Sequence, residues 1–167
     1  MNLTINEATA GDIPFIVGIL TEAIQYKLNH DDTAWGSRAF SDEEVSGMVA
    51  SGLTYIVYLE GKPVGTVRLQ WKDKLFWGEQ APDAGYIHLL AVAPDMHGQG
   101  VGAKVIDWAV EQVAQNNRKF LRLDCRADNK ELCDYYEKQG FVQKDTRRID
   151  NDVLGIHYTA VLYERKA

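Results

Sequence analysis

A glycine-rich turn between an apolar run and a helical pattern is the part of this sequence best suited to binding a phosphate. The run 86–92 is apolar enough for a mostly buried strand, and apolar residues recur every four positions from Val101 to Val113, as on one helix face. Gly98 and Gly100 therefore lie where the helix opens. Without side chains they let an anion approach free backbone N–H groups, where the helix dipole also favours negative charge. We predict a phosphate site at this turn.

The same glycines match part of a dinucleotide-binding fingerprint. Gly98, Gly100 and Ala103 have the spacing Gly-x-Gly-x-x-Gly/Ala. Asp124 follows about twenty residues later, where that fold places a ribose-binding acid. In that fold, however, the first glycine follows its strand almost at once, whereas residues 93–97 intervene here. Dinucleotide-dependent redox chemistry stays open as an alternative.

Residues 86–141 resemble the central motifs of the GNAT superfamily of acyl-CoA N-acyltransferases. In that family an apolar strand leads through a Pro-containing loop to Gln/Arg-x-x-Gly-x-Gly/Ala, which wraps the pyrophosphate of coenzyme A. Gly100 and Gly102 match this motif, and His97 takes the usual Gln/Arg position. The departure at His97 affects one expected phosphate contact.

A second signature of the family, Asn followed by apolar residues and Tyr-Glu-Lys-x-Gly-Phe, resembles residues 129–141. The resemblance implies the GNAT fold: an α/β structure with a mixed, mostly antiparallel sheet, a central splayed strand pair and flanking helices, in a single domain over residues 1–167. It also implies acetyl-CoA as co-substrate. The residues expected to hold it are Leu90, Ala91, Val92, His97, Gly98, Gln99, Gly100, Val101, Gly102, Ala103, Lys104, Asn129 and Tyr136.

Acetyl transfer to an amine needs a base, an acid and a donor for the thioester oxygen. An alkyl amine near pKa 10.4 is mostly protonated at neutral pH, so a base must remove a proton, and the departing thiolate benefits from an acid. The resemblance assigns Tyr136 as general acid and the backbone N–H of Val92 as the oxygen donor. His88, with an imidazole pKa near 6.5, is the candidate base. Glu79 and Asp83, acting through water, are alternatives, and a packed core histidine is another.

Acceptor recognition is expected between the first two helices and in the loop 72–85, which form the acceptor side in the family. Acids and indoles together suit an ammonium or guanidinium group. The candidates are His30, Asp31, Asp32, Trp35 and Trp77. Solvated acids and packed tryptophans are the structural alternative. Because residues 30–32 are adjacent, they do not converge as dispersed metal ligands do, and we predict no metal.

Composition narrows the class of protein further. With 167 residues, 46% of them hydrophobic and 25% charged, we expect one soluble domain. The apolar runs are too short for a membrane span and the N-terminus has no leader pattern, which predicts a cytoplasmic protein. A net charge of -6 disfavours nucleic acid as a partner. The expected partner is a small-molecule or peptide amine, and a homodimer is left open. A non-catalytic coenzyme A sensor or interaction module is the alternative function.

Periodicity and capping signals supply the elements that would position these residues. Strands are predicted at 2–7, 54–59, 63–71, 86–92, 120–125, 141–147 and 155–164. Helices are predicted at 10–28, between Ser41 and Gly52, from the glycine turn to 116, and at 129–139.

Overall fold

One sheet holds every strand of residues 2–167, the part of the chain that the computed structural model describes. The elements in chain order are β1 (Leu3–Glu7), η1 (Ala10–Asp12), α1 (Ile13–Leu28), α2 (Asp42–Ala50), β2 (Thr54–Leu59), β3 (Lys62–Gln70), α3 (Lys74–Trp77), β4 (Ala84–Val92), η2 (Pro94–Met96), α4 (Val101–Gln115), β5 (Phe120–Arg126), α5 (Lys130–Lys138), β6 (Val142–Asn151) and β7 (Ile156–Lys166). All predicted strands and helices are confirmed. The loop 72–85 differs, because it contains the short helix α3.

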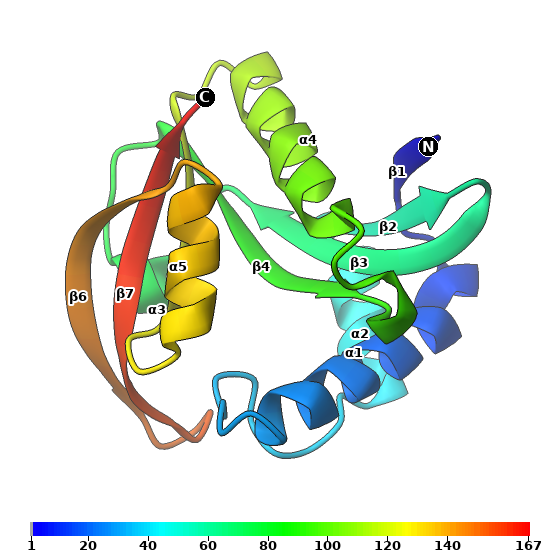
Figure 1. The fold of residues 1–167 in the computed structure, drawn as a ribbon, viewed down its shortest axis with the longest axis horizontal. Coiled ribbons are helices and arrows are strands. Elements are labelled where there is room, and N and C mark those ends of the chain that lie inside the picture. Colours follow the sequence, from blue (N-terminus) through cyan, green and yellow to red (C-terminus); the bar gives the residue numbers. More distant parts are fainter. Residues whose placement is uncertain (1) are drawn as a thin grey trace.

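The sheet runs in the order β1-β2-β3-β4-β5-β7-β6. Its pairs are antiparallel except β4 with β5, which is parallel (Figure 1). This topology confirms the expected mixed, mostly antiparallel sheet with flanking helices. It is not the doubly wound parallel sheet of dinucleotide-binding folds, so the redox alternative is wrong.

The central strands β4 and β5 pair at one end and separate at the other. Their register covers only Ala84–Tyr86 of β4 against residues 120–122 of β5, although both strands continue beyond it. Leu89 has a φ of 49°, a left-handed conformation rare for leucine, and the β3–β4 register shifts opposite it. This bulge bends β4 away from β5 and produces the expected splay (Figure 1).

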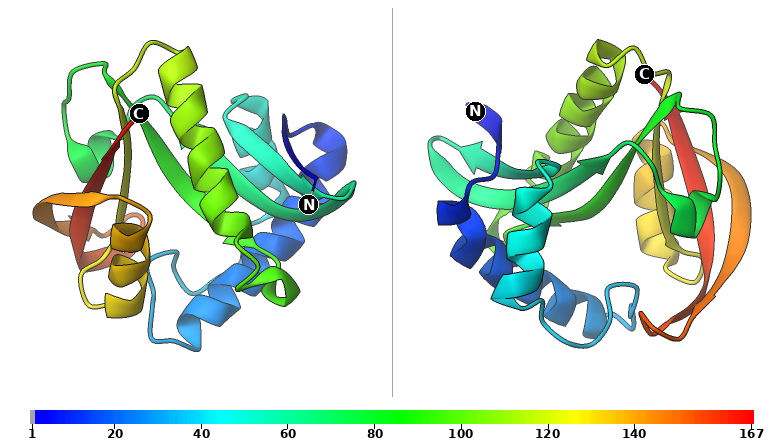
Figure 2. Two further views of the ribbon diagram at one scale, coloured as in Figure 1. Left: turned by 45° about the horizontal axis from the view of Figure 1, so that its top comes forward. Right: turned by 180° about the vertical axis from the view of Figure 1, so that it is seen from behind.

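Helices cover both faces of the sheet (Figure 2). On one face α4 buries Val101, Val105, Ala109 and Val113, the predicted apolar face. A Cβ at Gly85 would lie 2.7 Å from Val113 Cγ2, so the glycine permits α4 to pack closely on the paired end of β4. The other face packs against α1 and α2. Within residues 2–167, no helix combines the length and apolar character needed to cross a bilayer.

Candidate active site

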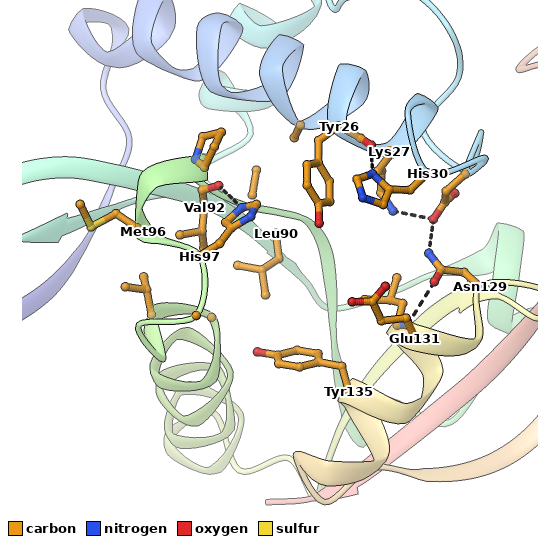
Figure 3. Close-up of a pocket in the computed structure, with 18 of the residues that line it drawn as sticks. Tyr26, Lys27, His30, Leu90, Val92, Met96, His97, Asn129, Glu131 and Tyr135 are labelled. Atoms are coloured by element: carbon orange, nitrogen blue, oxygen red, sulfur yellow. Dashed lines mark hydrogen bonds and ion pairs between the residues drawn. The ribbon is translucent and has the colours of Figure 1, made fainter.

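A cleft of about 560 Å³ lies beside the splayed strands, between α1, β4, the start of α4 and α5 (Figure 3). Most of the predicted cofactor residues line it. They are Leu90, Ala91, Val92, His97, Gly98, Gly100, Val101, Gly102, Ala103, Asn129 and Tyr136. Gln99 and Lys104 are not part of the lining; Gln99 donates from Nε2 to the carbonyl of Asp95 at 2.9 Å, and Lys104 is exposed.

The glycine turn has the conformation that an anion site needs. Gly98 and Gly100 have φ values of 76° and 77°, in the left-handed region that favours glycine. Nothing lies within 4 Å of a Cβ built at either position, so these glycines leave open space in front of the chain. The helix α4 begins directly after them, at Val101, with the free N–H groups of its first turn on the cleft.

His97 folds back onto its own strand. Its Nε2 lies 3.0 Å from the carbonyl oxygen of Val92, and its ring meets the ring of Tyr26 edge-on at 5.2 Å (Figure 3). Protonated at Nε2, the imidazole donates to that carbonyl. The side chain thereby fixes the distance between β4 and the glycine turn.

The two adjacent tyrosines of α5 both line the cleft but differ in their surroundings. Tyr135 points across the cleft toward α4 (Figure 3), and its hydroxyl lies 2.9 Å from where a Cβ of Gly102 would be. Tyr136 packs its ring 5.8 Å from that of Phe141 and 6.3 Å from that of Tyr163. Burial is the main cause of the raised pKa of Tyr136, and the nearby Cys125 contributes less. The phenol therefore keeps its proton at neutral pH.

Asn129 ties α5 to the end of α1. Its Oδ1 caps α5 by accepting from the Leu132 N–H at 3.1 Å, and its Nδ2 donates to Asp32 Oδ2 at 2.7 Å. Lys27 donates to the same Asp32 oxygen at 2.8 Å and lies 5.0 Å from the centre of the Trp35 ring. Lys27 thus supplies from within the chain the cation that Asp32 and Trp35 were expected to bind.

Three of the five predicted acceptor residues, His30, Asp32 and Trp35, line the cleft, whereas Asp31 and Trp77 do not. The Nδ1 of His30 lies 2.7 Å from the Tyr26 carbonyl, and the imidazole stacks on the Tyr26 ring. Asp31 is exposed at a φ of 58°, outside the cleft lining. Trp77 is buried under Arg122, whose guanidinium lies 4.8 Å from the indole, at the paired end of β4 and β5.

The predicted base, His88, faces the side of the sheet opposite Leu90 because the Leu89 bulge separates them. Its Nε2 lies 3.1 Å from Asp73 Oδ2, and about a fifth of the imidazole is exposed. Asp73 is held in place by capping α3, accepting from the Phe76 N–H through Oδ1 at 3.1 Å. Burial opposes the charged imidazolium, but the hydrogen bond and charge of Asp73 outweigh it, so the pKa of His88 is raised.

Asp124 completes this cluster from the splayed part of β5. Burial raises its pKa to about 7, although the charge of His88 opposes the shift. Asp73, His88 and Asp124 each place a donor atom within 4.8 Å of the others, the composition of a small metal site. The positive charge of Arg68 acts on His88 from β3 and opposes a further cation there. We interpret the cluster as a group that handles protons.

The alternative bases lie toward the paired end. Glu79 is exposed and forms an ion pair with Lys74 at 2.7 Å. Asp83 precedes β4 and lies 3.6 Å from Arg122. His88 is five positions after Asp83, about 16 Å along the extended chain, beyond the reach of one bridging water.

Sequence reasoning missed Asp73 and Arg68. Aspartate is a favoured N-cap residue, and Asp73 caps α3 by accepting from the Phe76 N–H. The helix α3 has only four residues, however, too few to show apolar periodicity in the sequence. Arg68 is the register partner of His88 on β3, a relation that follows from the strand register and not from the spacing of the two residues.

Comparison with known proteins gives consistent matches. A model of the acetyltransferase (GNAT) family matches residues 13–141. The chain is 25% identical over 138 residues to YesJ, an uncharacterized N-acetyltransferase of Bacillus subtilis, covering 78% of this chain and 76% of that protein. It is 24% identical over 144 residues to the aminoalkylphosphonate N-acetyltransferase of Salmonella typhimurium, covering 86% and 87%.

A solved aminoglycoside acetyltransferase, in complex with coenzyme A and kanamycin, has the same fold. Its TM-score is 0.77 at 20% identity, over 99% of this chain and 95% of that chain.

Proposed function

This chain belongs to the GNAT family of acetyltransferases, and on that premise we propose that it moves an acetyl group from acetyl-CoA to the primary amine of a small molecule. One observation carries the proposal: the glycine turn and the His88–Asp73 pair flank the same splayed segment of β4, on opposite sides. A thioester reaching the gap from one face therefore meets an amine arriving from the other. This arrangement supports our proposal of direct attack in a ternary complex.

The residues present fit coenzyme A. The left-handed glycines leave open space in front of the N–H groups of α4, which suits a pyrophosphate. Beyond Tyr86, the β4 edge that faces β5 has no strand partner, which leaves backbone groups near Leu90 and Val92 for the pantetheine arm. When bound, acetyl-CoA supplies an acetyl group activated as a thioester. The Val92 N–H is the proposed donor to its oxygen.

His88 acts as the base in this proposal, and Asp73 orients it. The Nε2 of His88 lies 3.1 Å from Asp73 Oδ2, and in this proposal that nitrogen carries the proton, so the lone pair on Nδ1 accepts the proton of the amine. The capping bond to Phe76 prevents the Asp73 carboxylate from rotating away. Asp73 is thus a positioning residue, comparable to the buried aspartate of a catalytic triad.

Tyr136 is the proposed general acid toward the departing thiolate. Its raised pKa keeps the phenol protonated at neutral pH, so its hydroxyl is available to donate a hydrogen bond to the developing thiolate. Its neighbour Tyr135 is proposed to line the cofactor arm instead, because its hydroxyl sits against the first turn of α4.

The acceptor is proposed as a small molecule, since two of the matched proteins are named for small-molecule amines, an aminoalkylphosphonate and an aminoglycoside. The aminoalkylphosphonate enzyme and the aminoglycoside enzyme differ in acceptor, so neither name transfers to this chain. We extend the proposal to a single cytoplasmic domain over residues 1–167 that needs no metal.

The test measures thiol release from acetyl-CoA against a broad panel of amines. We expect amine-dependent release by the wild-type protein, and no release above background with Gly100→Glu, whose side chain adds bulk and negative charge at the pyrophosphate. Gly61→Glu is the matched control, because Gly61 has a φ of 78° and open space but lies in the β2–β3 turn. Coenzyme A binding without turnover of any amine would favour the sensor alternative. Normal coenzyme A binding by Gly100→Glu would show that the phosphate site is elsewhere.

A further inference from the structure

Arg68 is a half-buried cation without a counter-ion. Its Nε is buried and has no hydrogen-bond partner, and among residues 2–167 its one side-chain hydrogen bond is long, from Nη2 to Ser51 Oγ at 3.4 Å. Within residues 2–167 it forms no ion pair, and burial alone lowers its pKa. Burying an uncompensated charge is costly, so a partner from outside the chain would stabilise this arrangement.

The position of Arg68 relates it to the proposed reaction. It is the cross-strand register partner of His88, and its charge is felt by that imidazole. Cross-strand neighbours on one face have Cβ atoms about 4.5–5.5 Å apart. With the acceptor nitrogen at His88, an oxyanion a few bonds away could therefore reach the neighbouring Arg68 side chain.

We infer that Arg68 binds an oxyanion of the acceptor, so that the preferred substrates are amines carrying a carboxylate or phosphonate a few bonds from the nitrogen. This inference rests on the proposed function and specifies its acceptor class. The planar guanidinium offers paired N–H donors that match both oxyanions. The same contact would hold the amine against Nδ1 of His88.

Balancing the acids of the cluster is the competing role for Arg68. Asp73 and Asp124 lie near His88, but neither forms an ion pair with Arg68. The acid that needs a cation, Asp73, has His88 at 3.1 Å. A purely balancing arginine would affect all acceptors alike, which makes the two roles separable.

The experiment compares matched acceptors. Acetylation of glycine is measured against glycinamide, and that of 2-aminoethylphosphonate against 2-aminoethanol, in the wild type, Arg68→Gln and Arg68→Lys. The amide has the less basic amine, so free-amine concentration alone favours it over the acid. We expect the wild type to prefer the anionic member of each pair. Arg68→Gln should lower kcat/KM for anionic members by about 10- to 100-fold and for neutral members by less than about twofold.

Controls and outcomes separate this inference from the function itself. Arg68→Lys should lie between wild type and Arg68→Gln, and Arg148→Gln, on exposed β6, should change neither member. Ethylphosphonate, which lacks the amine, should inhibit the wild type competitively against the acceptor; this arm needs no variant. Three outcomes would overturn the inference while leaving acetyl transfer intact. Arg68→Gln could lower kcat/KM equally for both members of a pair, ethylphosphonate could fail to inhibit, or the protein could acetylate only amines without an oxyanion. Failure of every amine in the panel would instead refute the proposed function.

Discussion

The paired and splayed ends of β4 and β5 differ in how completely their buried charged groups are paired. At the paired end, Arg122 has partners on all sides: its Nε donates to Glu164 Oε2 at 2.8 Å, its Nη1 donates to the Tyr86 hydroxyl at 3.0 Å, and its guanidinium stacks on Trp77. At the splayed end, Arg68 forms no ion pair with any residue of the described range 2–167.

Carboxylates show the same contrast. Glu164 at the paired end accepts a hydrogen bond from Arg122 and has Lys144 at 3.9 Å. Asp124, two residues beyond Arg122 on the same strand, is so poorly solvated that its pKa rises to about 7. A carboxyl group whose pKa is raised by burial does not stabilise the fold, but a pKa near neutral pH suits proton transfer.

The two ends of this strand pair therefore have different roles. Full pairing of charges at one end holds the sheet together, and incomplete pairing at the other leaves groups for the substrate to satisfy. Substitutions at the splayed end should therefore affect chemistry more than stability, and those at the paired end the reverse.

Replacing the proposed base should have the largest effect on chemistry. His88→Gln keeps a polar side chain but removes the proton acceptor, and we expect kcat/KM to fall by about 10²–10⁴-fold, the usual contribution of general base catalysis. The melting temperature should change little, because His88 is a member of the incompletely paired cluster. Steady-state kinetics and thermal unfolding measure the two effects; His157→Gln, exposed on β7, is the control. Full activity in His88→Gln would assign the base elsewhere.

Removing the arginine of the paired end should have the opposite signature. Arg122→Met leaves Glu164 buried without its main partner, at a cost of about 3 kcal/mol, the lower end for a broken buried ion pair because Lys144 remains nearby. The melting temperature should fall by about 6–12 °C. Acetyl transfer measured well below that temperature should stay within about twofold of wild type. A loss of turnover with unchanged melting would remove the distinction between the two ends.

Features that depend on residues close together in the sequence were predictable, and features that depend on residues far apart were not. The helices and strands follow from local signals: Ser41 and Glu44 form the capping box that begins α2, and the apolar repeat of α4 is buried as predicted. The glycine turn is equally local, because left-handed residues favour glycine.

The structure of the splayed end does not follow from local sequence signals. Leucine rarely adopts the left-handed conformation that bends β4 at Leu89, so the residue type there does not predict the bulge. The contact of Asp73 with His88 joins residues fifteen positions apart through a helix of four residues.

The proposed acid at the splayed end should have a smaller effect than the base. Tyr136→Phe should lower kcat by about 10- to 100-fold, at or below the usual range for acid catalysis, because a thiol of pKa near 8.5 leaves readily as its anion. Coenzyme A affinity should stay within about threefold, since the ring remains packed. Tyr135→Phe, one residue away, removes the hydroxyl that we place along the cofactor arm, so it should keep its kcat and any change should appear in coenzyme A affinity. If both variants turn over normally, neither hydroxyl is the acid.

The smallest predicted effect is a shift in pH dependence. Asp73 raises the pKa of His88, and burial and Arg68 oppose it, so removing the carboxylate lowers that pKa. The base form of His88 exists above its pKa, and the activity of the wild type therefore falls as the pH decreases through a value above 6.5, the ordinary value for histidine. Asp73→Ser retains a side chain that can cap α3 and should move this acidic limb of kcat/KM to lower pH. Asp73 also raises the pKa of Asp124, so both groups move in the same direction.

The matched control for this shift is Asp83→Ser, which removes a carboxylate beside Arg122 at the paired end. Its acidic limb should coincide with that of the wild type, because Asp83 has no contact with His88 among the interactions of residues 2–167. Both profiles are measured with the same amine, so ionisation of the acceptor cancels in the comparison. A limb that moves equally in both variants reports the net charge of the protein. A limb that moves in neither shows that Asp73 only caps α3, and the difference between the two ends of the strand pair then rests on His88 alone.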